Sequence, residues 1–150
     1  MIDLEFAFAA RVTVGPPLEL GTTHLGRRRI IPIMGGTVEG PRLQGKALPG
    51  GADWQIIRAD GVAELEARYT IEAADGSLIS VVNRGFRHGP PQVMRKLIAG
   101  EPVDPRAYYF RCAPTFETAA PAHQWLTRTV IVGEGERHPD RVELRFYAVL

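Results

Sequence analysis

The sequence predicts an all-β fold: a single antiparallel β-barrel of the lipocalin-like, up-and-down type with one short helix. Strand-like runs recur about every ten residues between Gly- and Pro-containing turns, and no linker or repeat divides residues 1–150. Two Asp-Gly dipeptides, at 60–61 and 75–76, separate alternating segments in the way that hairpin turns do. Only one segment shows the apolar i, i+4 spacing of a helix. We therefore expect one barrel domain over the whole chain.

The first half of the chain is expected to form four strands, each followed by Gly- or Pro-containing turns, over residues 4–14, 28–33, 37–48 and 52–59. The clearest strand is 62–73, in which Leu65, Ala67, Tyr69 and Ile71 fall on one face and charged residues on the other. A return strand at 78–86 follows the second Asp-Gly turn. These segments predict an antiparallel meander.

The one expected helix covers residues 90–99, with proline at its start and Gly100 after its end. Further strands are expected at 108–118, 126–132 and 142–149. We favour a barrel over a sandwich because four charged side chains stand in the middle of strands and would line a polar interior: Arg68, Arg84, Arg111 and Glu117. Alternatively, these groups face water from one side of a sandwich.

Composition excludes several classes of protein. The 150 residues carry a net charge of +1, which gives no sequence-wide electrostatic reason to bind nucleic acid. No apolar run approaches the ~20 residues of a membrane span, and residues 1–10 lack the basic start of a secretory signal. A single cysteine and four scattered histidines leave little for a disulfide or a metal site. We expect a cytoplasmic protein with no metal, cofactor, nucleic-acid or membrane partner.

A set of short motifs occurs in order along the chain. They are GGTVEGP at 35–41, LPGGADW at 48–54, ARYT at 67–70, NRG at 83–85, YYFR at 108–111, FE at 116–117, WL at 125–126 and GEG at 133–135. Together they resemble the domain-of-unknown-function 3237 family, small bacterial and fungal proteins, over nearly the whole chain. The resemblance implies a β-barrel-like domain, a homo-oligomer and, from fungal members in polyketide pathways, cyclisation or dehydration chemistry. One departure is Thr127, where the family pattern leads us to expect Asn before Arg128.

Two carboxylates are the candidate catalytic groups. Asp53 follows three small residues, two of them glycines, which let the backbone turn sharply and present the side chain at a cavity rim. Lodged against Trp54, it would have a raised pKa and act as general acid or base; alternatively, it hydrogen-bonds its own backbone in a turn. Glu117 would complete an acid–base pair, or else form a buried salt bridge with Arg111.

Two arginines, Arg68 and Arg111, are candidate substrate-binding groups because a guanidinium fork binds a carboxylate or an enolate in bidentate fashion. The alternative for Arg68 is a structural ion pair across the sheet, with carboxylates on the face of Glu66.

Three further residues would complete the substrate-binding set. Asn83 is the only asparagine of the chain, and its amide would position a carbonyl; otherwise it caps a turn. Trp125 would form the floor of a pocket, or is a plain core residue. Tyr108 lies in the same strand region as Arg111.

Three functions follow from these residues. The first is a cofactor-independent enzyme that performs proton-transfer chemistry (dehydration, isomerisation or cyclisation) on a small oxygenated ligand, with Asp53 or Glu117 moving the proton. The second is a non-catalytic small-molecule binder with the same pocket. The third is a structural oligomer whose charges form ion-pair networks without a cavity.

Overall fold

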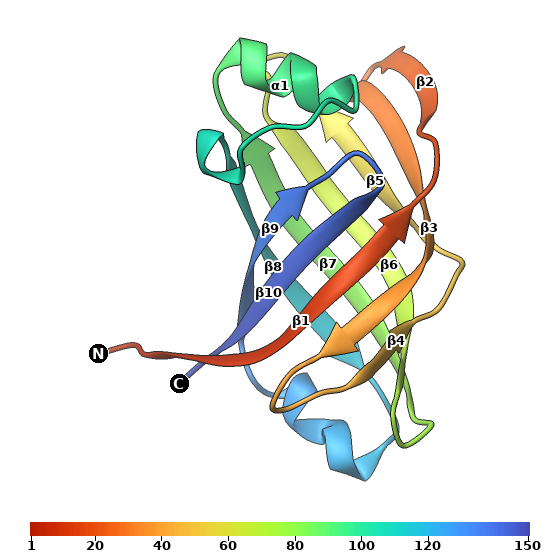
Figure 1. Cartoon of the computed structure of the whole chain (residues 1–150), viewed down its shortest axis with the longest axis vertical. Coiled ribbons are helices and arrows are strands. Elements are labelled where there is room, and N and C mark those ends of the chain that lie inside the picture. Colours follow the sequence, from red (N-terminus) through yellow and green to blue (C-terminus); the bar gives the residue numbers. More distant parts are fainter.

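Ten strands form one antiparallel sheet that closes on itself as a barrel in the computed structural model, which describes residues 1–150 (Figure 1). One α-helix and two 3₁₀ helices, η1 and η2, complete the fold. The predicted fold class is therefore confirmed. In chain order the elements are β1 (Leu4–Val14), β2 (Leu18–Thr23), β3 (Gly26–Glu39), β4 (Gly45–Ala47), β5 (Ala52–Ile57), β6 (Ala63–Ala73), β7 (Leu78–His88), α1 (Pro91–Ile98), η1 (Pro105–Ala107), β8 (Tyr109–Glu117), η2 (Pro121–Thr127), β9 (Ile131–Arg137) and β10 (Arg141–Val149).

The closed wall of the barrel is eight strands around, with β4 and β5 counted as one position and β2 outside the closed ring. From β6 to β10 each strand pairs with its neighbour in the chain, and β10 pairs with β1. The wall closes where β3 pairs with β1, with Ala10 opposite Val38. The other edge of β3 pairs with β5 and then with β4. Both of these short strands also pair with β6, so together they occupy one position in the wall, between β3 and β6. β2 pairs with the remaining part of β3, beyond the end of β1.

The junction between β8 and β9 is the shortest ladder in the wall. These strands pair at two positions, Arg111 with Glu134 and Cys112 with Gly133, which is fewer than any other strand pair shows. Beyond the ladder, a side chain replaces a strand partner: the backbone N–H of Arg137 donates to the Tyr108 hydroxyl at 2.8 Å. This contact satisfies a buried backbone group that the short ladder leaves free.

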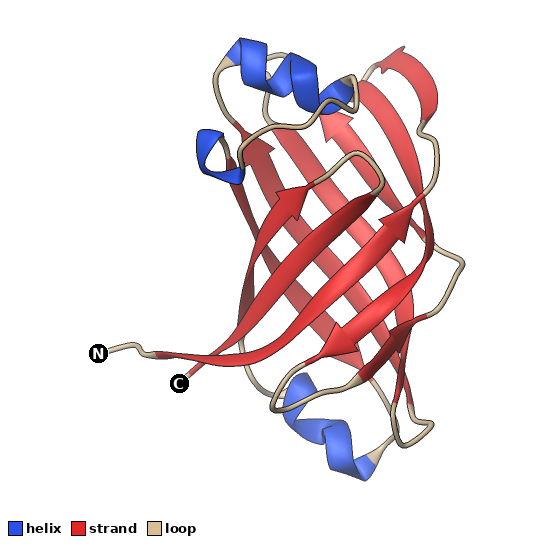
Figure 2. Ribbon diagram, in the orientation of Figure 1, coloured by secondary structure: helices blue, strands red, loops and turns tan.

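The core fills the barrel because alternate residues of each strand point inward. On β6 the inward residues include Leu65, Tyr69 and Ile71, and the rings of Phe8 and Phe146 pack with centroids 4.9 Å apart. Helical segments cover the two ends (Figure 2): α1 with Met94 and Leu97 at one end, η2 with Leu126 at the other. None of these helices has the length and apolar character that crossing a bilayer requires.

Most expected elements are present. The helix and the meander around the two Asp-Gly turns are confirmed. The expected end of a strand at Gly35-Gly36 is wrong, because β3 continues through both glycines. A Cβ at Gly36 would lie 2.1 Å from the carbonyl oxygen of Arg11, so the pair allows two strands to approach closely at a register shift instead of ending one. Residues 18–23 form a strand that we did not expect, and the expected strand at 126–132 begins only at Ile131, after η2.

Candidate functional site

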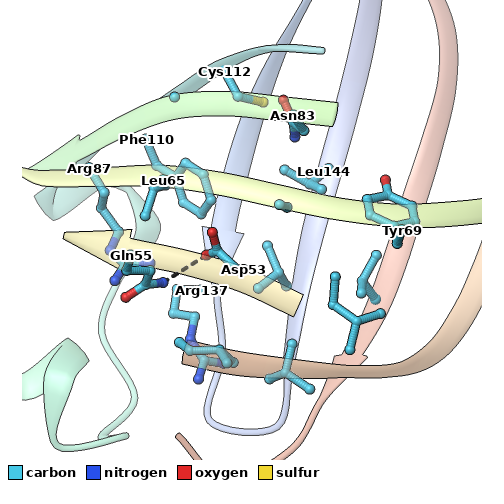
Figure 3. A pocket seen from close by; sticks show the side chains of 17 residues that line it. Asp53, Gln55, Leu65, Tyr69, Asn83, Arg87, Phe110, Cys112, Arg137 and Leu144 are labelled. Carbon is cyan, nitrogen blue, oxygen red and sulfur yellow. Dashed lines mark hydrogen bonds between the residues drawn. The ribbon is translucent and has the colours of Figure 1, made fainter. Parts of the chain in front are cut away.

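A small hollow lies inside the barrel, among residues of eight different strands (Figure 3). Its volume is about 50 Å³, which suffices for a few water-sized groups at roughly 10–15 Å³ each. Most of its wall is apolar. The polar exceptions are Asp53, Gln55, Tyr69, Asn83, Arg87 and Arg137. An apolar cavity with a few convergent polar groups is the usual form of a small-molecule site.

The turn before β5 directs Asp53 inward. Gly51 has a φ of +83° and passes so close to β6 that no side chain would fit there. The strand that follows pairs with β6, and Asp53 Oδ1 accepts a hydrogen bond from the backbone N–H of Glu66 at 3.0 Å. Asp53 Oδ2 accepts one from Gln55 Nε2 at 2.8 Å (Figure 3). The carboxyl group is therefore held in one orientation by two donors.

Burial raises the pKa of Asp53, although the hydrogen bond from Gln55 and the positive charge of Arg87 oppose the shift. As a whole residue Asp53 is half-buried, but its carboxyl group is surrounded by protein and faces the hollow. Loss of hydration disfavours the charged form of an acid more than these partners restore it. Asp53 is thus the one carboxyl on the hollow, and its pKa lies above that of an exposed aspartate.

Four polar atoms on the wall of the hollow have no hydrogen-bond partner in the protein. They are Gln55 Oε1, Tyr69 OH, Asn83 Oδ1 and Arg87 Nε, out of five such buried atoms in the whole chain. Buried polar groups are normally paired, because leaving one unpaired costs roughly 1–3 kcal/mol. Their concentration around one cavity indicates a surface built to hydrogen-bond a guest.

Three buried arginines gather at the end of the hollow nearer α1: Arg29, Arg87 and Arg137. Arg29 binds Glu19 at 2.8 Å and the carbonyl of Ile98 in α1 at 3.3 Å. Arg137 donates to the carbonyl oxygens of His138 and Arg141. Burial lowers the pKa of Arg87 to about 10, so this side chain is still charged at neutral pH.

Of the residues expected in the site, the structure brings Asp53 and Asn83 together on the hollow, and Tyr108 lies close by. The Tyr108 side chain is buried beside the arginines, where its hydroxyl accepts the N–H of Arg137.

The expectation that Arg68, Arg111 and Glu117 also line the hollow is wrong. All three are exposed on the outer face of the wall, at strand positions that alternate with the inward residues. Arg68 lies 3.7 Å from Glu66 of its own strand, so its ion pair is structural but does not cross the sheet as the alternative had it. Arg111 lies 4.0 Å from Glu134 and not beside Glu117. Removing a charged group from water costs far more free energy than leaving it solvated, so the strand face that carries these charges turns outward.

Trp125 does not form the floor of this hollow either. It belongs to η2 at the far end of the barrel, packs against the core and carries the guanidinium of Arg42 3.8 Å above its ring. Its position matches the plain core alternative.

Sequence reasoning missed Gln55, Tyr69, Arg87 and Arg137. A signal for two of them was present. Arg87 is four residues after Asn83 and therefore on the same face of β7, beside Gly85. Gln55 shares its face of β5 with Asp53 in the same way.

The whole chain matches one protein-family model, described as a protein of unknown function (DUF3237), over residues 2–149. The chain belongs to the DUF3237 family. A UPF0311 protein of Rhodopseudomonas palustris is 45% identical over 149 residues, which cover 99% of this chain and 97% of that protein. The crystal structure of a conserved protein of unknown function from R. palustris superposes with a TM-score of 0.95 at 45% identity, over 100% of this chain and 98% of that one.

Other similar proteins have the same barrel. A β-barrel-like protein from Acinetobacter baumannii superposes with a TM-score of 0.88 at 42% identity, over 100% of this chain and 97% of that one. The hydroalkoxylation enzyme phnH of Penicillium herquei is 32% identical over 79 residues, which cover 53% of this chain and 52% of the enzyme. An enzyme structure from the same fungus has the same fold, with a TM-score of 0.74 at 22% identity over 99% and 95% of the two chains.

One group of side chains in this DUF3237 protein has the composition of a metal site but is committed to other contacts. The ligand atoms of Glu136, His138 and Glu143 lie within 4.8 Å of one another. Glu143, however, pairs with Arg11 and Arg141, each at 3.0 Å. Two guanidinium groups at one carboxylate oppose a bound cation, and the arrangement is that of a surface ion-pair network.

The hollow is separated by a thin wall from a groove on the outside of the barrel. Leu65, Gly85 and Cys112 line both, and the groove continues over Val132 and Gly133 beside the short β8–β9 ladder. A Cβ at Gly133 would lie 2.8 Å from Cys112 Sγ, so glycine is needed for the thiol to pack here.

We expect Cys112 to be unreactive in the folded protein. Burial raises the pKa of its thiol from 9.0 to about 11, which lowers the thiolate fraction about 100-fold near neutral pH. Reaction with Ellman's reagent at about pH 8 should therefore be at least that much slower in the native protein than in urea. Similar rates in the two states would contradict this placement of the side chain.

Proposed function

We propose that this DUF3237 protein is an enzyme that moves protons on a small oxygenated organic substrate, with Asp53 as its acid–base group and without a cofactor. The observation that carries the proposal is the position of Asp53. Its carboxyl group has a raised pKa and faces a hollow whose unpartnered donors and acceptors are free to hydrogen-bond a ligand. A general acid or base works best when its pKa lies near the working pH, and a raised pKa brings a carboxyl group closer to that range.

The chemical step follows from these groups. The Asp53 carboxylate accepts a proton from the carbon beside a substrate carbonyl, and the electron pair of the broken C–H bond moves onto the carbonyl oxygen as an enolate. Burial raises the pKa of Tyr69, whose hydroxyl thus stays protonated and has no partner of its own, so it can donate to that oxygen. Asp53 then returns the proton to another atom of the substrate. Isomerisation, dehydration and cyclisation all use this exchange.

The fungal relative supports this class of reaction. Hydroalkoxylation adds an O–H bond across a C=C bond, which moves a proton but transfers no electrons to or from the substrate. The named enzyme matches 53% of this chain, so it supports proton-transfer chemistry here and does not identify a substrate. A homo-oligomeric state and a cytoplasmic location stay predictions.

Deuterium exchange tests the proposal. In D₂O, the protein should catalyse replacement of the hydrogens beside the carbonyl of levulinate, 2-oxobutanoate or butanone, followed by proton NMR. Asp53→Asn should lower the rate by about 10²–10⁴-fold, because it removes the acid–base group but keeps an acceptor for the Glu66 N–H.

The matched control for this experiment is Glu117→Gln, which makes the same chemical change on the outer face and should leave the rate unchanged. Equal exchange by wild type and Asp53→Asn would contradict the role of Asp53. Binding of these compounds without any exchange would favour the alternative, a non-catalytic binder with the same hollow.

A further inference from the structure

The positive charge inside the barrel is not balanced by the protein. Arg87 and Arg137 are buried, yet no carboxylate oxygen lies within 4.0 Å of either guanidinium, and Asp53 takes part in no ion pair at that distance. The carboxylate partner of Arg29 is Glu19, which is itself bonded to Arg27 as well. If Asp53 is ionised, its one negative charge faces two arginines, and if it is protonated, it offers none.

Arg87 is the least satisfied of these groups. It is 2% exposed, its Nε has no partner, and none of its guanidinium nitrogens donates to a protein acceptor, whereas Arg29 and Arg137 both donate to backbone carbonyls. The nearest aromatic ring, Phe110, has its centroid 5.7 Å from the Arg87 Cζ. A buried charge without a partner is strongly destabilising, so the arrangement is explained best by a partner that comes from outside.

We propose that Arg87, supported by Arg137, binds a carboxylate of the substrate, so that the substrate of this DUF3237 protein is a small organic acid. The planar fork of a guanidinium matches a carboxylate in two parallel hydrogen bonds. The hollow is small, which limits the ligand to a compact molecule, and its wall beyond the arginines is apolar, which suits a short carbon chain attached to that carboxylate. That this acid is a substrate rests on the proposed function, but binding of the acid at Arg87 does not depend on catalysis.

The layout of the hollow gives the acid an orientation. Figure 3 shows Arg87, Arg137 and Gln55 close together, Asp53 next to them, and the Tyr69 hydroxyl and Asn83 farther along the cavity. A carboxylate held by Arg87 places the carbon chain beside Asp53 and points its far end toward Asn83. The chemistry would therefore occur within a few bonds of the carboxylate, which favours oxo acids and unsaturated acids.

A matched pair of ligands tests the inference by isothermal titration calorimetry. Levulinate and methyl levulinate have the same carbon chain and ketone, and only the first is charged. Wild type should bind levulinate at least about 10-fold more tightly than the ester, and Arg87→Met should remove that difference. Arg84→Met is the control, since Arg84 lies on the outer face of the same strand and binds Glu66 at 2.8 Å. The Arg84→Met variant should bind both ligands with the affinities of wild type.

Three results would overturn the inference: equal affinity for acid and ester, no binding of levulinate or 2-oxobutanoate, or tighter binding of inorganic phosphate than of either acid. Arg87→Met should fold, because it removes an unpaired buried charge and keeps an apolar chain of similar length. If it does not fold, Arg137→Met answers the same question.

Asp53→Asn separates this inference from the proposed function, because it keeps both arginines. If Asp53→Asn still discriminates acid from ester while wild type shows no deuterium exchange, the carboxylate site stands and the proton-transfer function fails. If Asp53-dependent exchange occurs without discrimination between acid and ester, the function stands and the carboxylate site fails.

Discussion

Replacing Gly51 by alanine is expected to destabilise the barrel by about 2–5 kcal/mol and to displace Asp53 from the hollow. The new Cβ would lie 2.1 Å from the carbonyl oxygen of Arg68 and 3.1 Å from its carbonyl carbon, both in the backbone of β6. A φ of +83° adds strain of about 1–2 kcal/mol for a residue with a side chain. The loop must move away from β6, which is where Glu66 holds the carboxyl of Asp53.

Gly50→Ala is the matched control, because Gly50 also has a positive φ, +104°, but nothing lies within 4 Å of its Cβ position. It should lose only the strain, about 1–2 kcal/mol. At about 2–4 °C per kcal/mol, the melting temperature of Gly51→Ala should fall clearly below that of Gly50→Ala, and its deuterium exchange should fall with it. Equal melting temperatures for the two variants would contradict the close approach of the loop to β6.

Asp53→Asn is expected to stabilise the protein increasingly as the pH rises. Burial raises the pKa of Asp53, which means that folding favours the protonated form. Its contribution to the free energy of unfolding is therefore fully present below the unfolded pKa, and it is lost as the pH rises through the higher folded pKa. Asparagine cannot ionise, so the variant escapes this loss. Each unit of pKa difference is worth about 1.4 kcal/mol, or about 3 °C in this size class.

The measurement is the melting temperature of variant minus wild type between about pH 4 and pH 8. Any pH-independent effect of the new amide cancels in the trend. Asp60→Asn should instead give a negative difference that is nearly constant above about pH 5. The hydrogen bond from Arg58 lowers the pKa of that exposed carboxyl, so the stability that its charge gives to wild type is lost only as the pH falls below the unfolded pKa. A flat or falling difference for Asp53→Asn would mean that its carboxylate is stabilised inside the barrel.

Alternation and turn chemistry were sufficient to predict the barrel. On β6 the apolar residues fall on one face and the charged residues on the other, and the two Asp-Gly turns fix the strands around it. How the wall closes could not be predicted from the sequence, because β3 pairs with four other strands and its glycines bend it without ending it. Nothing local in residues 18–39 specifies these distant partners.

The site was predicted in part, for a reason that one strand makes clear. Asp53 and Asn83 were found through their unusual settings, after two glycines and as a lone asparagine. Arg68 and Arg111 were assigned to the interior because a polar face was expected to line it, whereas the interior face is the apolar one with a few polar exceptions. Applied to β7 from Asn83 onward, alternation would have placed Arg87 inside and Arg84 outside.

The short β8–β9 ladder has a consequence for how molecules reach an enclosed interior. Only two residue pairs join these strands, so parting the wall here breaks fewer interstrand bonds than at any other junction. The residues Gly85 and Cys112 separate the inner space from the outer groove at this place. Transient breathing of this seam would create a lateral portal, and amide protons of β9 next to it are the ones that should exchange with solvent before the rest of the wall.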